Sequence, residues 1–355
     1  MTDISVRASR TFVVANLVAT VMVVAIHYAS YREHLPIRID SLNYRIQEFF
    51  INGLSRVAVP FFALAAGMFL FRGWVSTAID YRARVKRRVR TLLIPYLLAS
   101  AVIFLCWFAF QARFDDSVFR LRWADVIWHL TIEPKAPQLW FLRDLILLVI
   151  LAPLLRFKPR WYSMVMGCVL LALWAAEIQG LPEIGRAYLL NNETMLFFWV
   201  GGLLAARPEL LEKTLDISTP IAVVVVAIWV GLVLVRVWID PEFDLAFVRK
   251  FTPLSLGLQK AAILTGVLAL VLVCRSIDFD TLMRLQRHAF FVYLFHTVPI
   301  IYIVRAATSR LVPADLEFYV SFLCATAIVF VVGQTTQRYF PQIYSVVTGG
   351  RQSKV

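Results

Sequence analysis

The chain has 355 residues, of which 60% are hydrophobic and 17% are charged. Soluble domains are roughly 45–50% apolar and about 25% charged, so this composition excludes an ordinary water-soluble protein and favours a multi-pass membrane protein. The net charge of +13 does not indicate nucleic-acid binding, because the basic residues gather in loops between apolar runs, as topology signals do.

Ten apolar runs follow one another along the chain, and no separate soluble domain stands between them. The runs lie near residues 11–30, 47–71, 91–111, 139–155, 161–178, 188–206, 219–238, 257–274, 288–305 and 317–336. Because lipid cannot satisfy open backbone groups, we expect each run to be a helix. The sequence therefore predicts an all-α integral membrane protein with about ten transmembrane helices, formed by one domain over residues 1–355 that ends in a short cytoplasmic tail, residues 344–355.

The basic loops predict how these helices are oriented. Seven arginine and lysine residues and one acid, Asp80, lie between Arg72 and Arg90, and Arg7 and Arg10 precede the first run. Loops on the other side carry both signs of charge. Since loops rich in arginine and lysine stay in the cytoplasm, we expect both termini to be cytoplasmic, in agreement with an even number of spans.

All four cysteines lie inside apolar runs, and none has the spacing of a metal site. We expect them to be small buried apolar residues rather than disulfide partners, and we expect no metal. The four are Cys106, Cys168, Cys274 and Cys324.

Ionisable residues inside the apolar runs mark the candidate functional site, because such residues are costly in hydrocarbon. If the first run starts at the cytoplasmic face near Phe12, His27 lies about 22 Å above that face at 1.5 Å per residue. The second run descends to the face at Arg72, which places Arg56 about 24 Å up. Both side chains therefore reach the same outer layer of a bilayer core roughly 30 Å thick.

Three more ionisable residues fall at a similar depth. The same arithmetic places Glu193 about 21 Å up, and Arg143 and Asp144 about 20 and 18 Å up. His296 lies only about 12 Å up, below this layer and facing the cytoplasmic half. The alternative interpretation is a structural ion-pair network, with His27 as a capped interfacial histidine and His296 as a satisfied core histidine.

Pro60 follows Arg56 by four residues inside the second run. A proline in a helix removes the hydrogen bond to the carbonyl four residues earlier, which here belongs to Arg56. A kink at this point would direct the helical turn that carries Arg56 toward the bundle interior. The alternative is an ordinary membrane-helix proline.

The basic run that leads into the third span has two interpretations. Arg84, Arg87 and Arg90 recur every three residues, and Arg88 lies between them. Arginine groups bind phosphate in a bidentate manner, so this face could hold a phosphorylated cofactor such as coenzyme A. The alternative is a stop-transfer signal attracted to anionic lipid headgroups.

These residues resemble the membrane-bound acyltransferase type 3 family over most of the chain. The segment from Ser55 to Gly67 resembles the family's span-two signature, and His27 falls where its first-span histidine lies. Weaker patterns follow at Leu139-Trp-Phe-Leu142, Phe197-Phe-Trp-Val-Gly-Gly202 and Val292-Tyr-Leu-Phe-His296. Two positions depart from the family: Asn16 replaces a common Arg or Lys eleven positions before the histidine, and Ala66 replaces a serine.

The resemblance implies a bacterial inner-membrane enzyme that moves an acyl group, usually acetyl, from cytoplasmic acyl-coenzyme A to a hydroxyl of a glycan or its lipid-linked precursor. His27 would act as a general base or would carry the acyl group as an acyl-imidazole. Arg56 would stabilise negative charge on the tetrahedral intermediate. The other assignments are Asp144 and Glu193 to catalysis, Trp140 and Arg143 to the acceptor, and Arg84, Arg87, Arg88, Arg90, Asn16 and His296 to the donor.

Competing interpretations come from other protein classes. Trp140 could be a membrane-interface anchor instead of a sugar-stacking ring. A transporter of a glycan or lipid-linked sugar would also want polar groups at mid-depth, but we find no pair of broken helices in matching halves of the sequence. A scaffold of a polysaccharide assembly complex would leave His27 dispensable.

Overall fold

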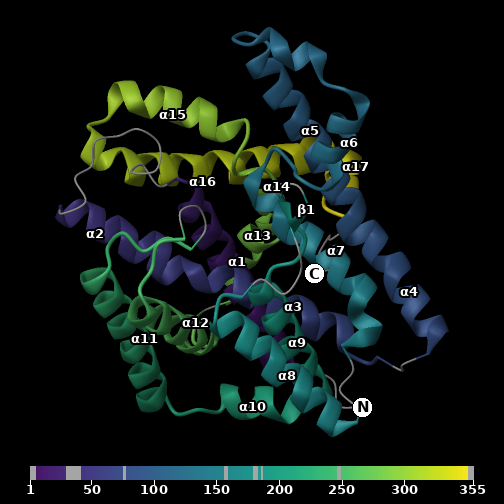
Figure 1. Cartoon of the computed structure of the whole chain (residues 1–355), viewed down its shortest axis with the longest axis vertical. Coiled ribbons are helices and arrows are strands. Elements are labelled where there is room, and N and C mark those ends of the chain that lie inside the picture. The colour runs from purple at the N-terminus through teal and green to yellow at the C-terminus, as the bar shows by residue number, and fades with distance from the viewer. Residues whose placement is uncertain are drawn as a thin grey trace.

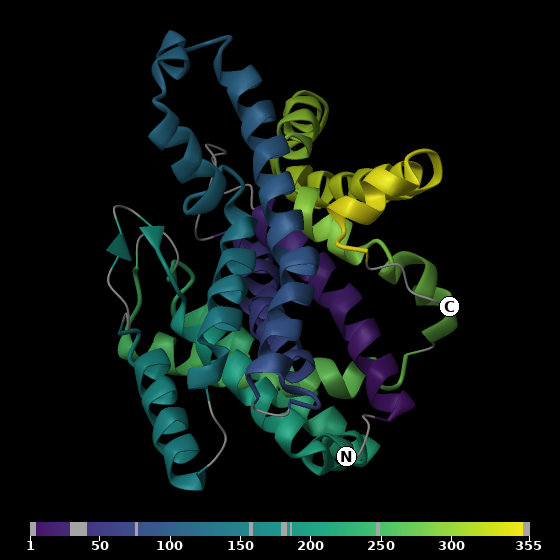
Figure 2. The same cartoon turned by 90° about the vertical axis from the view of Figure 1, so that its right-hand side faces the viewer.

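The computed structural model describes residues 5–28, 41–74, 77–155, 159–178, 183–184, 187–245, 249–277 and 279–350. Helices dominate it, and they pack side by side into a bundle (Figure 1). The end of α5 and helix α6 project together beyond the rest of the bundle in both views (Figure 2).

The first half of the chain supplies the helices that later form the candidate site. They are α1 (Val6–His27), α2 (Leu42–Glu48), η2 (Phe49–Gly53), η3 (Leu54–Val57), α3 (Ala58–Phe71), α4 (Ala78–Arg88), η4 (Val89–Leu93), α5 (Ile94–Gln111), η5 (Asp116–Arg120), α6 (Trp123–Thr131), η6 (Pro137–Leu139), α7 (Trp140–Leu151), η7 (Ala152–Leu154) and α8 (Arg160–Ala175).

The second half begins with a two-residue antiparallel strand pair and continues as helices. The elements are β1 (Glu183–Ile184), β2 (Ala187–Tyr188), α9 (Asn192–Ala206), α10 (Pro208–Leu215), α11 (Thr219–Ile239), α12 (Pro253–Cys274), α13 (Phe279–Gln286), α14 (Ala289–Phe295), α15 (Ile300–Leu311), α16 (Ala314–Tyr339) and α17 (Pro341–Val347).

Every predicted apolar run contains a helix, which confirms the all-helical membrane class. Within the described ranges, seven segments are long and apolar enough to cross a membrane, and two bent helix pairs raise the number to nine if each pair is one span. The remaining predicted span corresponds to α8, which is apolar but only 16 residues long. Helix α11 leaves Ile221, Val223, Val224 and Ile228 exposed, as a surface that faces lipid does.

The second span changes its helical form just before Arg56. A π-helical segment, η2, and a 3-10 segment, η3, separate α2 from α3, and Gly53 at their junction has φ −98° and ψ −92°. Pro60 lies in the first turn of α3, where its missing N–H costs no helical bond. The irregularity that we expected from the proline therefore begins upstream of it, in a π-helical turn of a kind that is frequent at functional sites.

Helices α3 and α9 cross unusually closely through two glycines. A Cβ atom on Gly67 would lie 1.9 Å from the carbonyl oxygen of Phe198, and one on Gly201 would lie 1.9 Å from that of Leu64. Small residues at a helix interface allow backbones to approach in this way. This crossing gives a physical reason for the glycines of both sequence patterns, and it fixes α3 against α9.

The end of the chain packs on the bundle. Tyr344, where the predicted cytoplasmic tail begins, lies inside α17 and is 2% exposed, and its hydroxyl is 2.9 Å from Nδ1 of His288. Burial raises the pKa of Tyr344 to about 12, and burial beside Arg287 lowers the pKa of His288. Both groups are therefore neutral at neutral pH, and the tail is part of the fold at least to Gly350.

The cysteines are free, as predicted, although their burial differs. Cys274 is buried, Cys106 is half-buried, and Cys168 and Cys324 are exposed. The two exposed cysteines lie on outward faces of α8 and α16, where an apolar thiol can face lipid as well as a protein core.

Candidate active site

A cavity of 1010 Å³ reaches from one end of the bundle into its centre. Its mouth is formed by Arg72, Arg84, Arg87 and Arg88, and we call this the basic end of the bundle. Its walls come from α1, α3, α4, η4, α7, α9, α10, α13 and α14. Ligand pockets are typically about 300–1,000 Å³, so the cavity is large enough for a cofactor-sized molecule.

The cavity brings together most of the residues assigned to the donor from the sequence. Asn16, Arg84, Arg87 and Arg88 line it. Among the described lining residues, two of the assigned ones are absent. Arg90 lies instead beside Gly349 and Gly350 of the packed C-terminal segment, and His296 lies deeper in the bundle.

Arg84 holds the cavity wall in addition to lining it. Its Nη1 donates to the carbonyl oxygens of Leu70 (2.6 Å) and Arg72 (3.0 Å), and its Nη2 donates to that of Gly73 (2.8 Å). Its Nε pairs with Asp80 at 3.0 Å. These bonds satisfy one carbonyl in the last turn of α3 and two just after it, so Arg84 ties the basic helix α4 to the end of α3.

The structure places His296 beside His27, which the sequence arithmetic did not predict. The two ring centroids are 5.1 Å apart, and the hydroxyl of Tyr28 donates to the backbone oxygen of His296 at 2.9 Å. The depth of 12 Å was counted from His288 as a surface residue, but His288 is itself buried. In addition, the chain bends by 74° between α14 and α15, so position along the sequence does not measure depth here.

The contacts of His296 define its tautomer. Its Nδ1 lies 3.1 Å from the carbonyl oxygen of Val292 and 3.0 Å from that of Tyr293. A carbonyl oxygen only accepts, so Nδ1 carries the proton, and Nε2 of the neutral ring is an acceptor. Within the described part of the chain, this Nε2 has no hydrogen-bond partner, and the residue is completely buried. His27 thus has a second imidazole with an available acceptor nitrogen as its neighbour.

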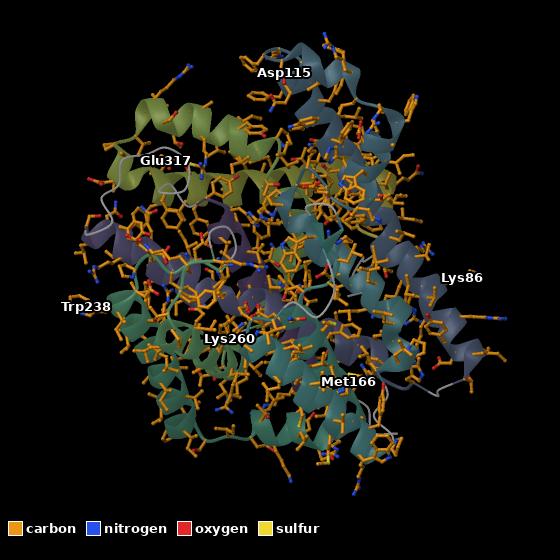
Figure 3. The ribbon with its side chains drawn as sticks, viewed as in Figure 1. Lys86, Asp115, Met166, Trp238, Lys260 and Glu317 are labelled. Carbon is orange, nitrogen blue, oxygen red and sulfur yellow. The ribbon has the colours of Figure 1, made fainter. Side chains whose placement is uncertain are left out.

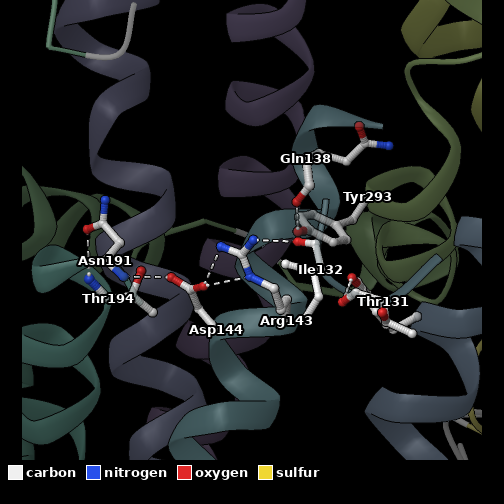
Figure 4. A network of polar contacts seen from close by, with 9 residues as sticks. Thr131, Ile132, Gln138, Arg143, Asp144, Asn191, Thr194 and Tyr293 are labelled. Carbon is white, nitrogen blue, oxygen red and sulfur yellow. Dashed lines mark hydrogen bonds and ion pairs between the residues drawn. The ribbon is translucent and has the colours of Figure 1, made fainter. Parts of the chain in front are cut away.

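Gln138 fixes the turn that carries His296. Its side chain donates to the carbonyl oxygen of Leu294 at 2.9 Å and accepts from the hydroxyl of Thr297 at 2.8 Å. The hydroxyl of Tyr293 donates to its backbone oxygen (Figure 4). Gln138 therefore clamps the break between α14 and α15 to the start of α7.

Arg143, Asp144 and Glu193 belong to one polar network, as their predicted common depth suggested. Arg143 pairs with Asp144 at 3.1 Å, and both side chains are buried. The second carboxylate oxygen of Asp144 accepts from the backbone N–H of Asn191 at 2.8 Å (Figure 4). The side chain of Asn191 in turn caps the backbone N–H of Glu193 at 2.8 Å. These bonds tie α7 to the start of α9 and favour the ion-pair interpretation for Arg143 and Asp144.

Glu193 joins a second group that the sequence reasoning missed. Trp174 donates its indole N–H to the carboxylate at 3.0 Å, and Lys260 lies 4.5 Å above the ring of Trp174. Lys260 also pairs with Glu177 at 2.9 Å, and it sits in the middle of the bundle (Figure 3). The sequence feature that could have identified Lys260 is its position as a basic residue at the fourth position of an apolar run.

Arg56 is held by a chain of buried polar residues. Its Nε and Nη2 donate to Oδ1 of Asn52, and Asn52 donates to Glu48 at 2.7 Å. Glu48 pairs with Arg236 of α11 at 3.3 Å, and both side chains are buried. Gln259 of α12 donates to the backbone oxygen of Asn52 at 3.0 Å. This network positions Arg56 from three directions, and α1, which ends in His27, packs directly against its segment η3.

Trp140 lies at the start of α7, with its ring edge-to-face on Phe141 at 5.9 Å between centroids. It is half-buried and is not among the described residues that line the cavity, although its neighbour Phe141 is. Among the described residues, no group of three or more histidine, cysteine, aspartate or glutamate side chains could hold a metal ion.

A helical membrane bundle with a basic cavity that leads toward a half-buried histidine, His27, and a buried one, His296, is the class of protein that this site defines. The family model of the acyltransferase domain matches residues 16–335, and the chain belongs to that family. The resemblance seen in the sequence is thereby confirmed.

The chain is also similar to a curated protein. It is 27% identical over 321 residues to the succinoglycan biosynthesis protein ExoH of Rhizobium meliloti (strain 1021), a match that covers 86% of this chain and 82% of that protein. No solved structure is a significant match to the chain.

Proposed function

We propose that the protein transfers an acetyl group from cytoplasmic acetyl-coenzyme A to a hydroxyl of a glycan, or of its lipid-linked precursor, in a bacterial inner membrane. Membership of the acyltransferase family supports the reaction class. The similarity to a protein named for succinoglycan biosynthesis supports a polysaccharide acceptor. The observation that carries the proposal is the basic cavity, which runs from an arginine-rich mouth toward His27 and His296.

The mouth of the cavity suits the phosphates of the donor. Arg87 and Arg88 line it from α4, and Arg72 lines it from the end of α3. A guanidinium group binds phosphate by two parallel hydrogen bonds. These paired bonds hold the phosphate more strongly than a single charge contact does. Arg84 has a different role in this proposal, because each of its three nitrogens already donates to a protein oxygen. It holds the wall against which the donor lies.

The orientation follows from the donor. Acyl-coenzyme A is a cytoplasmic metabolite, so the basic end would face the cytoplasm, in agreement with the positive-inside rule. Both chain termini would then be cytoplasmic, with about ten spans. The network of Arg143, Asp144 and Glu193 would lie nearer the opposite face, where a glycan acceptor arrives.

His27 would carry the chemistry. As a general base it takes the proton of the acceptor hydroxyl while that oxygen attacks the thioester carbonyl, and it returns the proton to the departing coenzyme A thiolate. As a nucleophile it first accepts the acyl group as an acyl-imidazole and then passes it to the hydroxyl. His296 would orient the ring of His27 in either course, because its unprotonated Nε2 can accept a hydrogen bond. Arg56 would stabilise the oxyanion, held in place by Asn52.

Asp144 takes a structural part in this mechanism. Its carboxylate is occupied by Arg143 and by the N–H of Asn191, so it acts by fixing α7 against α9. Glu193 is held by Trp174, so it would orient His27 or bind the hydroxyls of the acceptor.

The test is acyl transfer by the purified protein in lipid nanodiscs, with acetyl-coenzyme A labelled in its acetyl group. We expect wild type to label an extracted glycan and to release free coenzyme A, and His27→Ala to do neither while it unfolds at the same temperature as wild type. His129→Ala, a histidine of α6 outside the site, is the matched control and should retain transfer.

Two further outcomes decide between the alternatives. In the first, wild type without acceptor accumulates label that hydroxylamine removes, while His27→Ala accumulates no such label. In that case His27 is the acyl carrier rather than the base. Normal transfer by folded His27→Ala would refute the mechanism. A folded wild type that transfers from no short acyl donor would favour the transporter or the scaffold.

A further inference from the structure

A second cavity, of 510 Å³, is lined chiefly by α8, α9, α10 and α12. It shares three lining residues with the basic cavity, Phe12, Leu204 and Leu211, which therefore stand between the two. Among its described lining residues none is charged, and nearly all are aliphatic or aromatic. We call this cavity the apolar groove.

The groove opens on the outer surface of the bundle. Met164 and Leu171 of α8 and Leu264 of α12 line it, and they are 69%, 46% and 49% exposed. Helix α12 is long and apolar enough to cross a membrane, and Val165, next to Met164 in α8, is exposed as well. An apolar surface on such helices faces lipid, so the medium at the opening is the hydrocarbon of the bilayer.

Neither water nor empty space suits the groove. A buried water makes about three hydrogen bonds to polar groups. The one hydroxyl among the described lining residues is that of Thr214, and it already donates to the backbone oxygen of Leu210 at 2.8 Å. An empty space of this volume would deprive its walls of van der Waals contacts, and protein interiors hold few voids larger than a water molecule. Hydrocarbon is therefore the filling that both the walls and the surrounding bilayer allow.

We propose that the apolar groove binds an acyl chain of a membrane phospholipid, which acts as a structural lipid between α8 and α12. Along α12 the lining residues run from Leu264 to Val271, about 10 Å of helix, so the groove takes part of a chain. Phospholipids form the bilayer and reach the opening directly, and the described lining holds no charged residue that would select a particular headgroup. Neither proposed catalytic histidine is among the described lining residues, so the proposal does not depend on acyl transfer.

The chain completes the packing of α8, which has only 16 residues. Helix α8 contacts α9 at Gly167, where a Cβ would lie 2.6 Å from the ring of Trp199, and at Trp174, whose indole donates to Glu193. Helices α8 and α12 both line the groove, so a chain bound in it contacts both. Lipid tails are as apolar as leucine, so the chain binds through van der Waals contacts with these walls and gains nothing from leaving water.

The experiment purifies the protein in digitonin, which has no alkyl chain to replace the lipid, and counts retained phospholipid by mass spectrometry of an organic extract. Cys168→Phe places a ring in the groove. Cys324→Phe is the matched control, because Cys324 is an exposed cysteine of α16 outside the described lining. We expect wild type and the control to retain a phospholipid, and Cys168→Phe to retain at least about tenfold less, because overpacking disfavours the bound chain.

Thermal unfolding supplies a second readout. A ligand that binds only the folded protein raises Tm as its concentration rises. Dioleoyl phosphatidylcholine, whose headgroup has no net charge for the basic run to bind, is added to delipidated protein. The Tm of wild type and of Cys324→Phe should rise by about 4 °C when this lipid is present at about 100 times its Kd, and that of Cys168→Phe by less.

Leu264→Phe fills the groove from α12 at an exposed position, and it tests the proposal even if Cys168→Phe does not fold. Equal retention of phospholipid by wild type and by a folded filled variant would overturn the site, because the lipid would then be bound elsewhere. A wild type that retains no lipid, and whose Tm does not respond to added phospholipid, would overturn it as well. A retained lipid with the mass of a polyprenyl phosphate would overturn the assignment to phospholipid.

Discussion

Substitution of Gly67 by alanine tests whether the close crossing of α3 and α9 holds the site together. The added Cβ would lie 1.9 Å from the carbonyl oxygen of Phe198, whereas ordinary contact begins at 3.4 Å. The obstacle is backbone, so no side-chain rotation can relieve it. The two helices must therefore separate locally by roughly 1.5 Å, the difference between these distances.

The loss in the free energy of unfolding can be estimated from the effect of overpacking in other protein cores. Extra methylenes in a well-packed interior cost about 1–3 kcal/mol, and a clash with backbone belongs at the upper end. Alanine gains up to about 1 kcal/mol of helix propensity over glycine, which offsets part of this. We expect a net loss of about 2 kcal/mol and a fall in Tm of about 3 °C. Activity should fall further, because α3 continues from the segment that carries Arg56, while α9 carries Glu193.

The assay is thermal unfolding of purified variants in one detergent, followed by acyl transfer in nanodiscs. Gly231→Ala in α11 and Gly257→Ala in α12 are the matched controls, because no described heavy atom lies within 4 Å of a Cβ built at either position. Both should be as stable as wild type or slightly more stable. If Gly67→Ala unfolds at the same temperature as these controls, the close crossing does not exist as described.

Two further predictions concern charges. Neutralisation of Arg87 and Arg88 to glutamine should raise the KM for the donor at least about tenfold, because a hydrogen bond to a charged group is worth roughly 1.5–3 kcal/mol. The same change at Arg82 and Lys86, which lie on the same helix but outside the cavity lining, should leave the KM for the donor unchanged. An equal rise in KM from both pairs would indicate that the basic run binds lipid headgroups and not the donor. Arg236→Met should cost roughly 3–5 kcal/mol, since it leaves a buried carboxylate without its cation. An unfolding temperature equal to wild type would contradict that pairing.

The sequence predicted best those features that depend on one helix at a time. Apolar runs gave the positions of the membrane helices, because burial in lipid demands a continuous helix. The rise per residue is fixed, so depth counted along unbroken helices brought Arg143, Asp144 and Glu193 to one level, and the structure joins them through Asn191. The arginine run gave the mouth of the cavity because its members share one helical segment.

The predictions missed what depends on breaks and on partners from other helices. His296 follows a helix that bends after seven residues, so its place beside His27 could not be counted from any face. Arg84 has the spacing of a phosphate ligand, yet it donates to three backbone carbonyl oxygens. The sequence pattern does not show where those carbonyls lie. Lys260 had a usable signal, its place in an apolar run, but its partner Glu177 belongs to a different helix end.

The buried ion pairs hold the helices in place around the proposed site. Paired charges in an interior add little net stability, because the cost of desolvation roughly cancels their attraction, so these pairs act chiefly by fixing geometry. Arg143 and Asp144 tie α7 to α9, Glu48 and Arg236 tie α2 to α11, and Lys260 and Glu177 tie α12 to the end of α8. Helix α1 packs against α3, α12 and η3 of this frame and carries His27. The charged pairs therefore hold the helices that surround the proposed site.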